Sequence, residues 1–211
     1  LTQMHPHSGD IKMNNPIKLG ASICLAMALA SSAFAEQVVL KFHTMVPMPA
    51  NSNAKFVKPW ADKVEAESNG EIKVEMYPSM QLGGAPPQLV DQVRDGVVDI
   101  VWTVAGYTPG RFPHLEVFEL PFMPGTATAT AQAVQEYVET VGASDLKDYK
   151  VLAVHVHAPG KIHTKNRLIK SQADFSGLKM RGPTRPITQM LEEMGATPVG
   201  MPVPKVAPSL S

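Results

Sequence analysis

The chain has 211 residues, with 19 Lys and Arg against 19 Asp and Glu, so its formal net charge is zero at neutral pH. This balance gives no reason to expect a nucleic acid or an anionic membrane as a partner. A single cysteine cannot form an internal disulfide, so the fold depends on its apolar core, and the 19 prolines indicate many loops between elements.

The first pattern in the chain is that of an export signal. Met13 begins a short, weakly basic stretch, which an almost uninterrupted apolar run follows from Leu19 to Ala30. The Ala-x-Ala sequence that ends at Ala35 supplies the small residues a signal peptidase needs, so residues 13–35 are predicted to be a signal peptide cut between Ala35 and Glu36. The apolar run is shorter than the roughly 20 residues of a membrane-spanning helix, so we expect no permanent anchor.

Two further features of the amino-terminal region bear on processing. Residues 1–12 precede the better start at Met13 and are expected to be an upstream extension. Cys24 follows Ile23, whereas a lipoprotein cysteine follows a small residue, so we do not expect lipid attachment. The remaining segment, 36–211, is long enough for one domain, or for one domain and part of another.

Strands and helices are predicted to alternate after the signal. Val38–Phe42 is a β-branched, apolar run and predicts a buried strand. Residues 53–67 carry one helical apolar stripe, at Phe56, Val57, Trp60, Ala61 and Val64. Asn69-Gly70 ends that helix, and Ile72–Tyr77 alternates with period two, as in a strand with one face in water.

The middle of the chain continues the alternation. A short helix is predicted over 87–94, a buried strand over 97–102, and a proline-rich loop over 106–124. An alanine-rich helix is predicted over 126–141, and a strand over 149–156.

The last third is predicted to hold a second set of such elements. A connector begins at Ser171, a short strand spans 178–181, and a helix spans 184–194. Another strand follows over 196–199, and residues 205–211 have the pattern of a helix that is just beginning. Alternating strands and helices build a mostly parallel sheet with helices on its faces, so the fold class is α/β. Ligands of such sheets bind at the carboxyl ends of the strands, where the strand order reverses.

Catalytic motifs are weak in this sequence. Gly83-Gly84 lacks the length and the lysine of a phosphate-binding loop, and no Gly-x-Ser-x-Gly sequence is present. On a strand, His155 and His157 would point to the same side and reach one metal ion, but neither a third histidine nor a carboxylate stands at a familiar spacing. We therefore expect neither a metal nor a cofactor. A metal-dependent hydrolase or lyase that uses His155 and His157 stays open as an alternative.

Several stretches, in this order and at this spacing, resemble one protein family. They are Leu40–His43, Gly70–Val74, Gln81–Gly83, Gly96–Ile100, Phe118–Phe122, Asp174–Arg181 and Met194–Pro198. The sequence resembles the substrate-binding receptors of tripartite ATP-independent periplasmic (TRAP) transporters, the group of the C4-dicarboxylate and sialic-acid receptors. The resemblance implies a two-lobed, type II-like periplasmic binding-protein fold and a receptor, not an enzyme, that hands an organic acid to membrane permease subunits in the periplasm.

The resemblance also implies where the ligand carboxylate binds. In this family the arginine of a Gly-Leu-Lys-x-Arg segment forms a two-bond salt bridge with that carboxylate, and Arg181 holds the position here. A planar, permanently charged guanidinium suits this role, and a structural ion pair is the alternative for Arg181. Some members carry a second arginine 20 residues earlier, where this chain has Lys161. That departure favours a monocarboxylate over a dicarboxylate or sialic acid. Lys161 remains a candidate ligand contact that supplies a point charge, and a solvated loop residue is the alternative for it.

Loop positions supply the other candidate ligand contacts. These residues follow predicted strands or turns at the expected crevice: His43, Trp102, Thr103, Phe122 and His157. For Trp102 and Phe122 a place in the apolar core is the competing interpretation. Family members continue beyond the position of Ser211, so we expect 36–211 to form the first lobe and the start of the second, with much of the second lobe missing.

Overall fold

The computed structural model describes residues 36–210, and the predicted signal peptide with Ala35 lies outside them. The chain divides into two units, Leu1–Gln37 and Val38–Ser211. Of the first unit only Glu36 and Gln37 are described, and neither belongs to a helix or strand. In the described part of the chain, no helix is long and apolar enough to cross a membrane.

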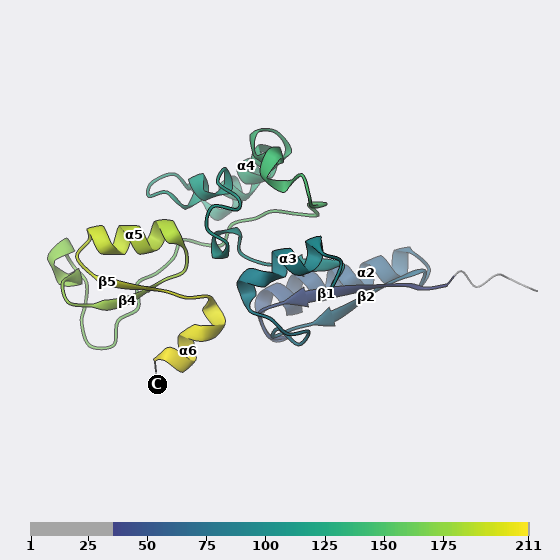
Figure 1. Ribbon diagram of the computed structural model, residues 1–211, viewed down its shortest axis with the longest axis horizontal. Coiled ribbons are helices and arrows are strands. Elements are labelled where there is room, and N and C mark those ends of the chain that lie inside the picture. The colour runs from purple at the N-terminus through teal and green to yellow at the C-terminus, as the bar shows by residue number, and fades with distance from the viewer. Residues whose placement is uncertain (1–35, 211) are drawn as a thin grey trace, which may run out of the picture. The chain divides into compact units, whose positions relative to one another are not determined.

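The first sheet has three parallel strands in the order β2-β1-β3 (Figure 1). They are β1 (Val38–Thr44), β2 (Ile72–Tyr77) and β3 (Ile100–Trp102). Because the chain adds β2 on one side of β1 and β3 on the other, the strand order reverses at β1. The expected parallel sheet is confirmed, and its switch point lies at the carboxyl end of β1.

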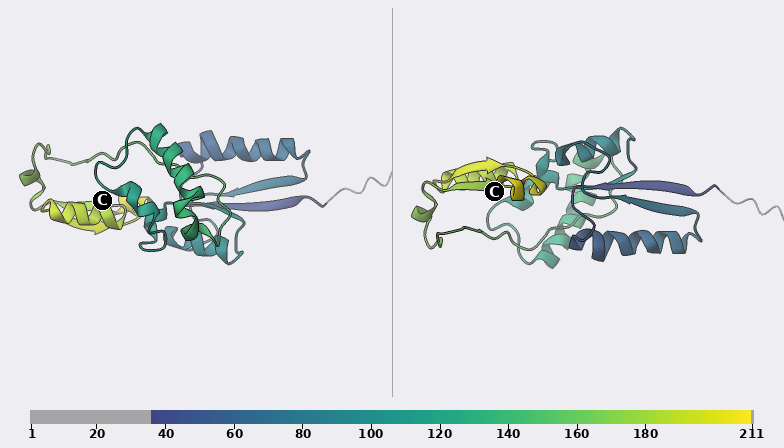
Figure 2. Two further views of the ribbon diagram at one scale, coloured as in Figure 1. Left: turned by 90° about the horizontal axis from the view of Figure 1, so that it is seen from above. Right: turned by 90° about the horizontal axis from the view of Figure 1, so that it is seen from below.

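A helix covers one face of this sheet. It begins as a π-helical turn, Asn53–Val57, and continues as α2 (Lys58–Glu67), where Pro59 falls within the first turn. Val57 and Ala61 are buried against Phe42 and Val74. Phe56 was expected in the same stripe, but it is exposed, because the π turn rotates it away from the α-helical register. Figure 2 shows α2 running beside β1 and β2.

A second packing layer forms on the short helix α3 (Leu89–Arg94), which the 3-10 turn Pro86–Gln88 precedes. Leu89 is completely buried and packs with Met45 and Tyr107. The strand predicted from Val97 begins only at Ile100. The backbone N–H groups of Val97 and Val98 donate to the carbonyl of Gln92 at the end of α3, at 2.9 and 3.4 Å, and so do not join the sheet.

The region after β3 consists of loops, 3-10 turns and one helix. The turns are Ala105–Tyr107, Leu115–Glu119 and Val141–Leu146. The helix α4 (Ala127–Glu139) begins at Thr126, whose side chain accepts a hydrogen bond from the N–H of Ala129, and it ends two residues before the predicted limit. Val134 and Val138 form its buried face.

The strand predicted over 149–156 is wrong. These residues form neither strand nor helix, and the extended segment reaches β4 without a sheet partner (Figure 2). A strand needs a neighbour for its backbone groups. Here the N–H of Val154 donates instead to the side chain of Gln135 on α4, at 3.1 Å.

A smaller parallel sheet follows, made of β4 (Lys179–Gly182) and β5 (Thr197–Gly200). The 3-10 turn Gln172–Phe175 leads into it, and α5 (Arg185–Glu193) connects its two strands. Phe175, Leu191 and Ala196 form the buried core between sheet and helix. Gly195 ends α5 with a φ of +93°, a conformation that glycine adopts readily.

The last described elements are the 3-10 turn Val203–Lys205 and α6 (Val206–Ser209). The helix beginning predicted for this region is therefore present.

Candidate ligand-binding site

The carboxyl end of β1 holds two buried polar residues, His43 and Thr44. The N–H of Leu82 donates to Nε2 of His43 at 3.3 Å, so Nδ1 carries the proton and donates to Oε1 of Gln92 at 2.7 Å. His43 thus joins the loop after β2 to α3, and neither ring nitrogen faces solvent. Its predicted contact with ligand stays a prediction. Thr44 has a buried hydroxyl oxygen without a hydrogen-bond partner in the described structure.

The carboxyl end of β3 presents Trp102 and Thr103, both half-buried. Nε1 of Trp102 donates to Nε2 of His155 at 3.0 Å, and the two rings are nearly parallel with centroids 6.0 Å apart. The indole also borders both apolar clusters of the first sheet. Trp102 is therefore at once a core residue and an oriented aromatic surface at a strand end.

The carboxyl end of β4 presents Arg181. Its Nε donates to the carbonyl oxygen of Met201 at 2.9 Å, which fixes the guanidinium at one edge. Arg181 forms no ion pair with any described carboxylate, so the structure gives no support to a purely structural ion pair. A guanidinium held through Nε keeps its terminal nitrogens for a two-bond contact with an external carboxylate.

The remaining predicted contacts lie on exposed loops. Lys161 and His157 are exposed, and Nδ1 of His157 lies 2.5 Å from the carbonyl oxygen of Ala158. Phe122 is fully exposed and has a φ of +64°, which is unusual for an aromatic residue, so it is not in the described core. No described hydrogen bond or ring contact joins Arg181 to Trp102, Phe122 or Lys161.

The basis of the metal hypothesis was wrong, because His155 and His157 do not lie on a strand. His155 bonds to Trp102, and His157 lies beside its neighbour's carbonyl. Among the described residues, no three His, Cys, Asp or Glu side chains are grouped as metal ligands would be.

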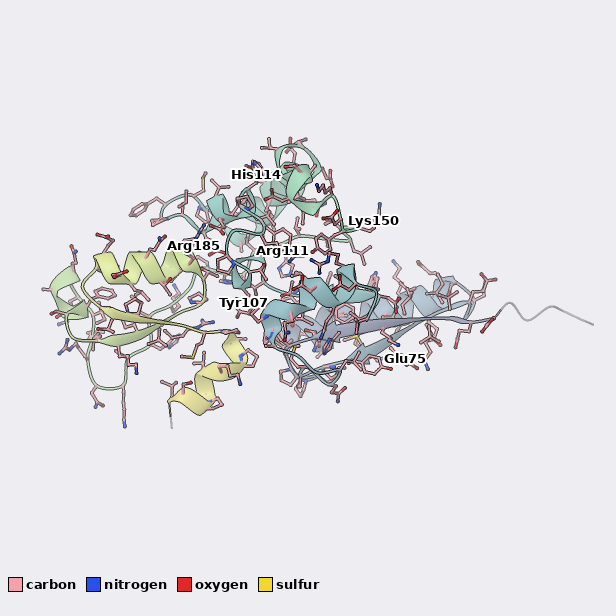
Figure 3. The ribbon with its side chains drawn as sticks, viewed as in Figure 1. Glu75, Tyr107, Arg111, His114, Lys150 and Arg185 are labelled. Atoms are coloured by element: carbon pink, nitrogen blue, oxygen red, sulfur yellow. The ribbon has the colours of Figure 1, made fainter. Side chains whose placement is uncertain are left out.

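Other interactions around these strand ends could not be predicted from the sequence. Arg111 (Figure 3) donates to Asp91 and to the hydroxyl of Tyr149, both at 2.8 Å, and its pKa is raised first by the bond to Tyr149. The hydroxyl of Tyr107 accepts a hydrogen bond from the N–H of Val203 at 3.0 Å. The only sequence signal was an aromatic and a basic residue in one proline-rich loop.

Charged groups also meet at the start of α5. Arg185 donates to Glu116 at 2.5 Å. The N–H of Gly110 and then Arg185 lower the pKa of the Glu116 carboxyl, although burial opposes them. Burial raises the pKa of the nearby Glu119 carboxyl. Glu119 belongs to the stretch Phe118–Phe122 that resembles the family, but the sequence did not indicate it as a site residue.

Comparison with known proteins assigns the chain to a family. The family described as bacterial extracellular solute-binding protein, family 7, matches residues 43–211. Among curated relatives, the C4-dicarboxylate-binding periplasmic protein of Rhodobacter capsulatus is 27% identical over 197 residues, which cover 91% of this chain and 59% of that protein.

Two solved structures are similar in both sequence and fold. One is a marine metagenome TRAP solute-binding protein specific for aromatic acid ligands, in complex with 3-hydroxybenzoate, at 80% identity and a TM-score of 0.81. The other is a TRAP solute-binding protein from Rhodoferax ferrireducens with copurified benzoate, at 55% identity and a TM-score of 0.80. Each match covers 82% of this chain and 54% of the other chain.

These matches confirm the expected α/β periplasmic binding-protein fold. The chain spans about half the length of the relatives it matches. With a matching family pattern over residues 43–211, the chain belongs to family 7 of the bacterial extracellular solute-binding proteins.

Proposed function

We propose that this protein is the periplasmic receptor of a TRAP transporter and captures an aromatic monocarboxylate. The observation that carries the proposal is Arg181, whose guanidinium stands at the carboxyl end of β4 without a carboxylate partner in the described structure. Carboxylate recognition by a forked guanidinium accounts for a charge that no described carboxylate pairs with.

The aromatic part of the proposal rests on Trp102 and on the relatives. The bond to His155 holds the indole in one orientation, so it can form a flat wall for a ring without losing side-chain freedom on binding. The relatives at 80% and 55% identity hold 3-hydroxybenzoate and benzoate. Lys161 is exposed and supplies at most a mobile point charge, which suits a ligand with one carboxylate.

Export completes the proposal. Residues 13–35 would direct the chain out of the cytoplasm, with cleavage after Ala35, and the membrane permease subunits would take the ligand from the receptor. Curated relatives are named periplasmic binding proteins, which supports this location. Sequencing the amino terminus of secreted protein tests the cleavage site, and a mature protein that still begins at Met13 would contradict it.

Calorimetric titration of protein expressed from the complete gene tests the ligand site. Losing one partner of a buried charge pair costs about 2–5 kcal/mol. Arg181→Ala should therefore weaken benzoate binding about 30- to 3,000-fold, since each 1.4 kcal/mol is about tenfold. Arg181→Lys should recover part of the loss, and Lys161→Ala should cost less.

Mass spectrometry of the copurified ligand provides an independent check, and succinate serves as the dicarboxylate control. If folded Arg181→Ala binds benzoate within threefold of wild type, the site assignment is wrong. If succinate binds better than benzoate, the ligand class is wrong.

A further inference from the structure

A buried carboxyl group that the proposed ligand contact does not use lies at Glu119. It ends the 3-10 turn Leu115–Glu119, and its Oε2 is buried without a hydrogen-bond partner among the described residues. The hydroxyl of Thr184, directly before α5, is buried and unpartnered in the same way, with the residue only 7% exposed. Buried oxygens without partners are rare, because each costs about 1–3 kcal/mol.

Both side chains pack against Gly106, in the turn after β3. A Cβ atom at Gly106 would stand 2.5 Å from Cγ2 of Thr184 and closer still to Oε1 of Glu119. Gly106 does not have a positive φ, so space and not backbone conformation excludes a larger residue there. Segments that follow β3, precede α4 and begin α5 therefore meet at these three residues.

Burial favours the neutral form of Glu119, and its polar and charged neighbours act in both directions. Burial raises the pKa of the Glu119 carboxyl most, the Thr184 hydroxyl partly offsets this, Glu116 adds to the rise, and His157 opposes it. Arg185, at the start of α5 (Figure 3), is paired with Glu116. The Thr184 hydroxyl can donate to a carboxyl oxygen of Glu119 after a small adjustment, and because this bond is stronger with the ionised carboxylate it lowers the pKa of that group.

Thr184 is close in sequence to Arg181, and the residues between them have little freedom. A Cβ atom at Gly182 would stand 3.1 Å from backbone atoms of Thr188 on α5, so this part of the chain is packed onto the helix. A shift of Thr184 is therefore passed to α5 and to the end of β4.

We propose that Glu119 is a positioning residue for Arg181, acting through a hydrogen bond to Thr184 that fixes the start of α5 and the strand end before it. This proposal rests on the proposed function, in which Arg181 binds the ligand carboxylate. It adds a group that touches no ligand but sets ligand affinity.

The test is calorimetric titration with 3-hydroxybenzoate of protein expressed from the complete gene, at pH 5.5 and pH 8. Glu119→Ala and Thr184→Val should each weaken binding about tenfold, the equivalent of one hydrogen bond. Glu119→Gln should bind within about threefold of wild type, because the amide keeps a donor and an acceptor. Glu192→Ala, exposed on α5, is the matched control and should match wild type.

The pH dependence of ligand affinity distinguishes a positioning role of Glu119 from a purely structural one, which would not change with pH. The Thr184 hydroxyl lowers the pKa of the Glu119 carboxyl, so the bond between them favours the ionised carboxylate. As pH falls through the raised pKa of Glu119, protonation weakens this bond, so wild-type affinity should fall from pH 8 to pH 5.5. Glu119→Gln should remove this dependence, whereas His157→Asn should retain it. If His157→Asn loses the pH dependence of affinity and Glu119→Gln retains it, the proposal is overturned.

Other outcomes also decide the matter. The proposal is overturned if both Glu119→Ala and Thr184→Val bind within twofold of wild type, or if they lower the melting temperature without changing affinity. Equal losses of affinity in Glu119→Ala and Glu119→Gln would also overturn it. If wild type does not bind 3-hydroxybenzoate, the ligand class fails, and amide hydrogen exchange over residues 182–188 without ligand still decides the contact. Faster exchange in Glu119→Ala than in Glu119→Gln supports it, and equal exchange overturns it.

Discussion

The first sheet and the segment over residues 149–170 contain similar apolar sequence but differ in packing. In the first sheet, β1 has a strand on each side and α2 on one face, and Phe42 is 4% exposed. In the segment, Leu152, Ile162 and Leu168 are 59%, 50% and 73% exposed. An apolar run becomes a strand only where other segments satisfy its backbone and cover its side chains.

Among the variants that test this comparison, truncation of the buried Leu89 should have the largest effect on the free energy of unfolding. Leu89→Ala should lower the free energy of unfolding by about 2–5 kcal/mol, because Leu89 is completely buried and leaves a cavity. Leu168→Ala should change it by less than about 0.5 kcal/mol, since the side chain is already in solvent. Urea unfolding of both variants measures the contrast, and equal losses would show that Leu168 is packed.

A buried amide near the first sheet should have an intermediate effect. Asn53 is completely buried, and its side-chain NH₂ donates to the carbonyls of Val46 and Pro47 at 3.0 and 3.2 Å. Asn53→Ala leaves both carbonyls without that donor and should cost about 1–3 kcal/mol. Asn166→Ala, on an exposed loop, is the control. Equal stability of the two variants in urea would mean that water replaces the amide freely.

The smallest effect is expected at Phe122. Its side chain is fully exposed and its φ is positive, so Phe122→Gly removes no packing and relieves an unfavourable backbone conformation. Thermal unfolding without ligand should show a change within about 1 kcal/mol, in either direction. A loss of more than about 2 kcal/mol would show that the aromatic ring is buried in solution.

The local elements were largely predictable because short-range chemistry determines them. Period-two alternation located β2 to the residue, and the helical spacing located α5 to within one residue at each end. The helix predicted over 53–67 corresponds to the π turn Asn53–Val57 together with α2. Pro59 and Gly195 act through backbone conformation, which is a property of the residue itself. The family and its fold were likewise visible in ordered sequence fragments and are confirmed by the match over residues 43–211.

The candidate site was less predictable, because side-chain partners come from distant segments. Sequence alone placed Arg181 and Trp102 at strand ends, but the bonds from Arg181 to Met201 and from Trp102 to His155 join residues 20 and 53 positions apart. It also placed His43 after the first strand without showing that both of its ring nitrogens are used internally.

The sequence by itself determined the alternation of strands and helices, their boundaries to within a few residues, and the family. Only the tertiary structure decided that residues 149–156 are not a strand, that Phe122 is exposed, and that Glu119 meets Thr184 at Gly106. The physical reason is that periodicity and turn chemistry act between residues close in the chain. Burial, by contrast, and with it the ionisation of a carboxyl group, depends on which distant segments pack around it.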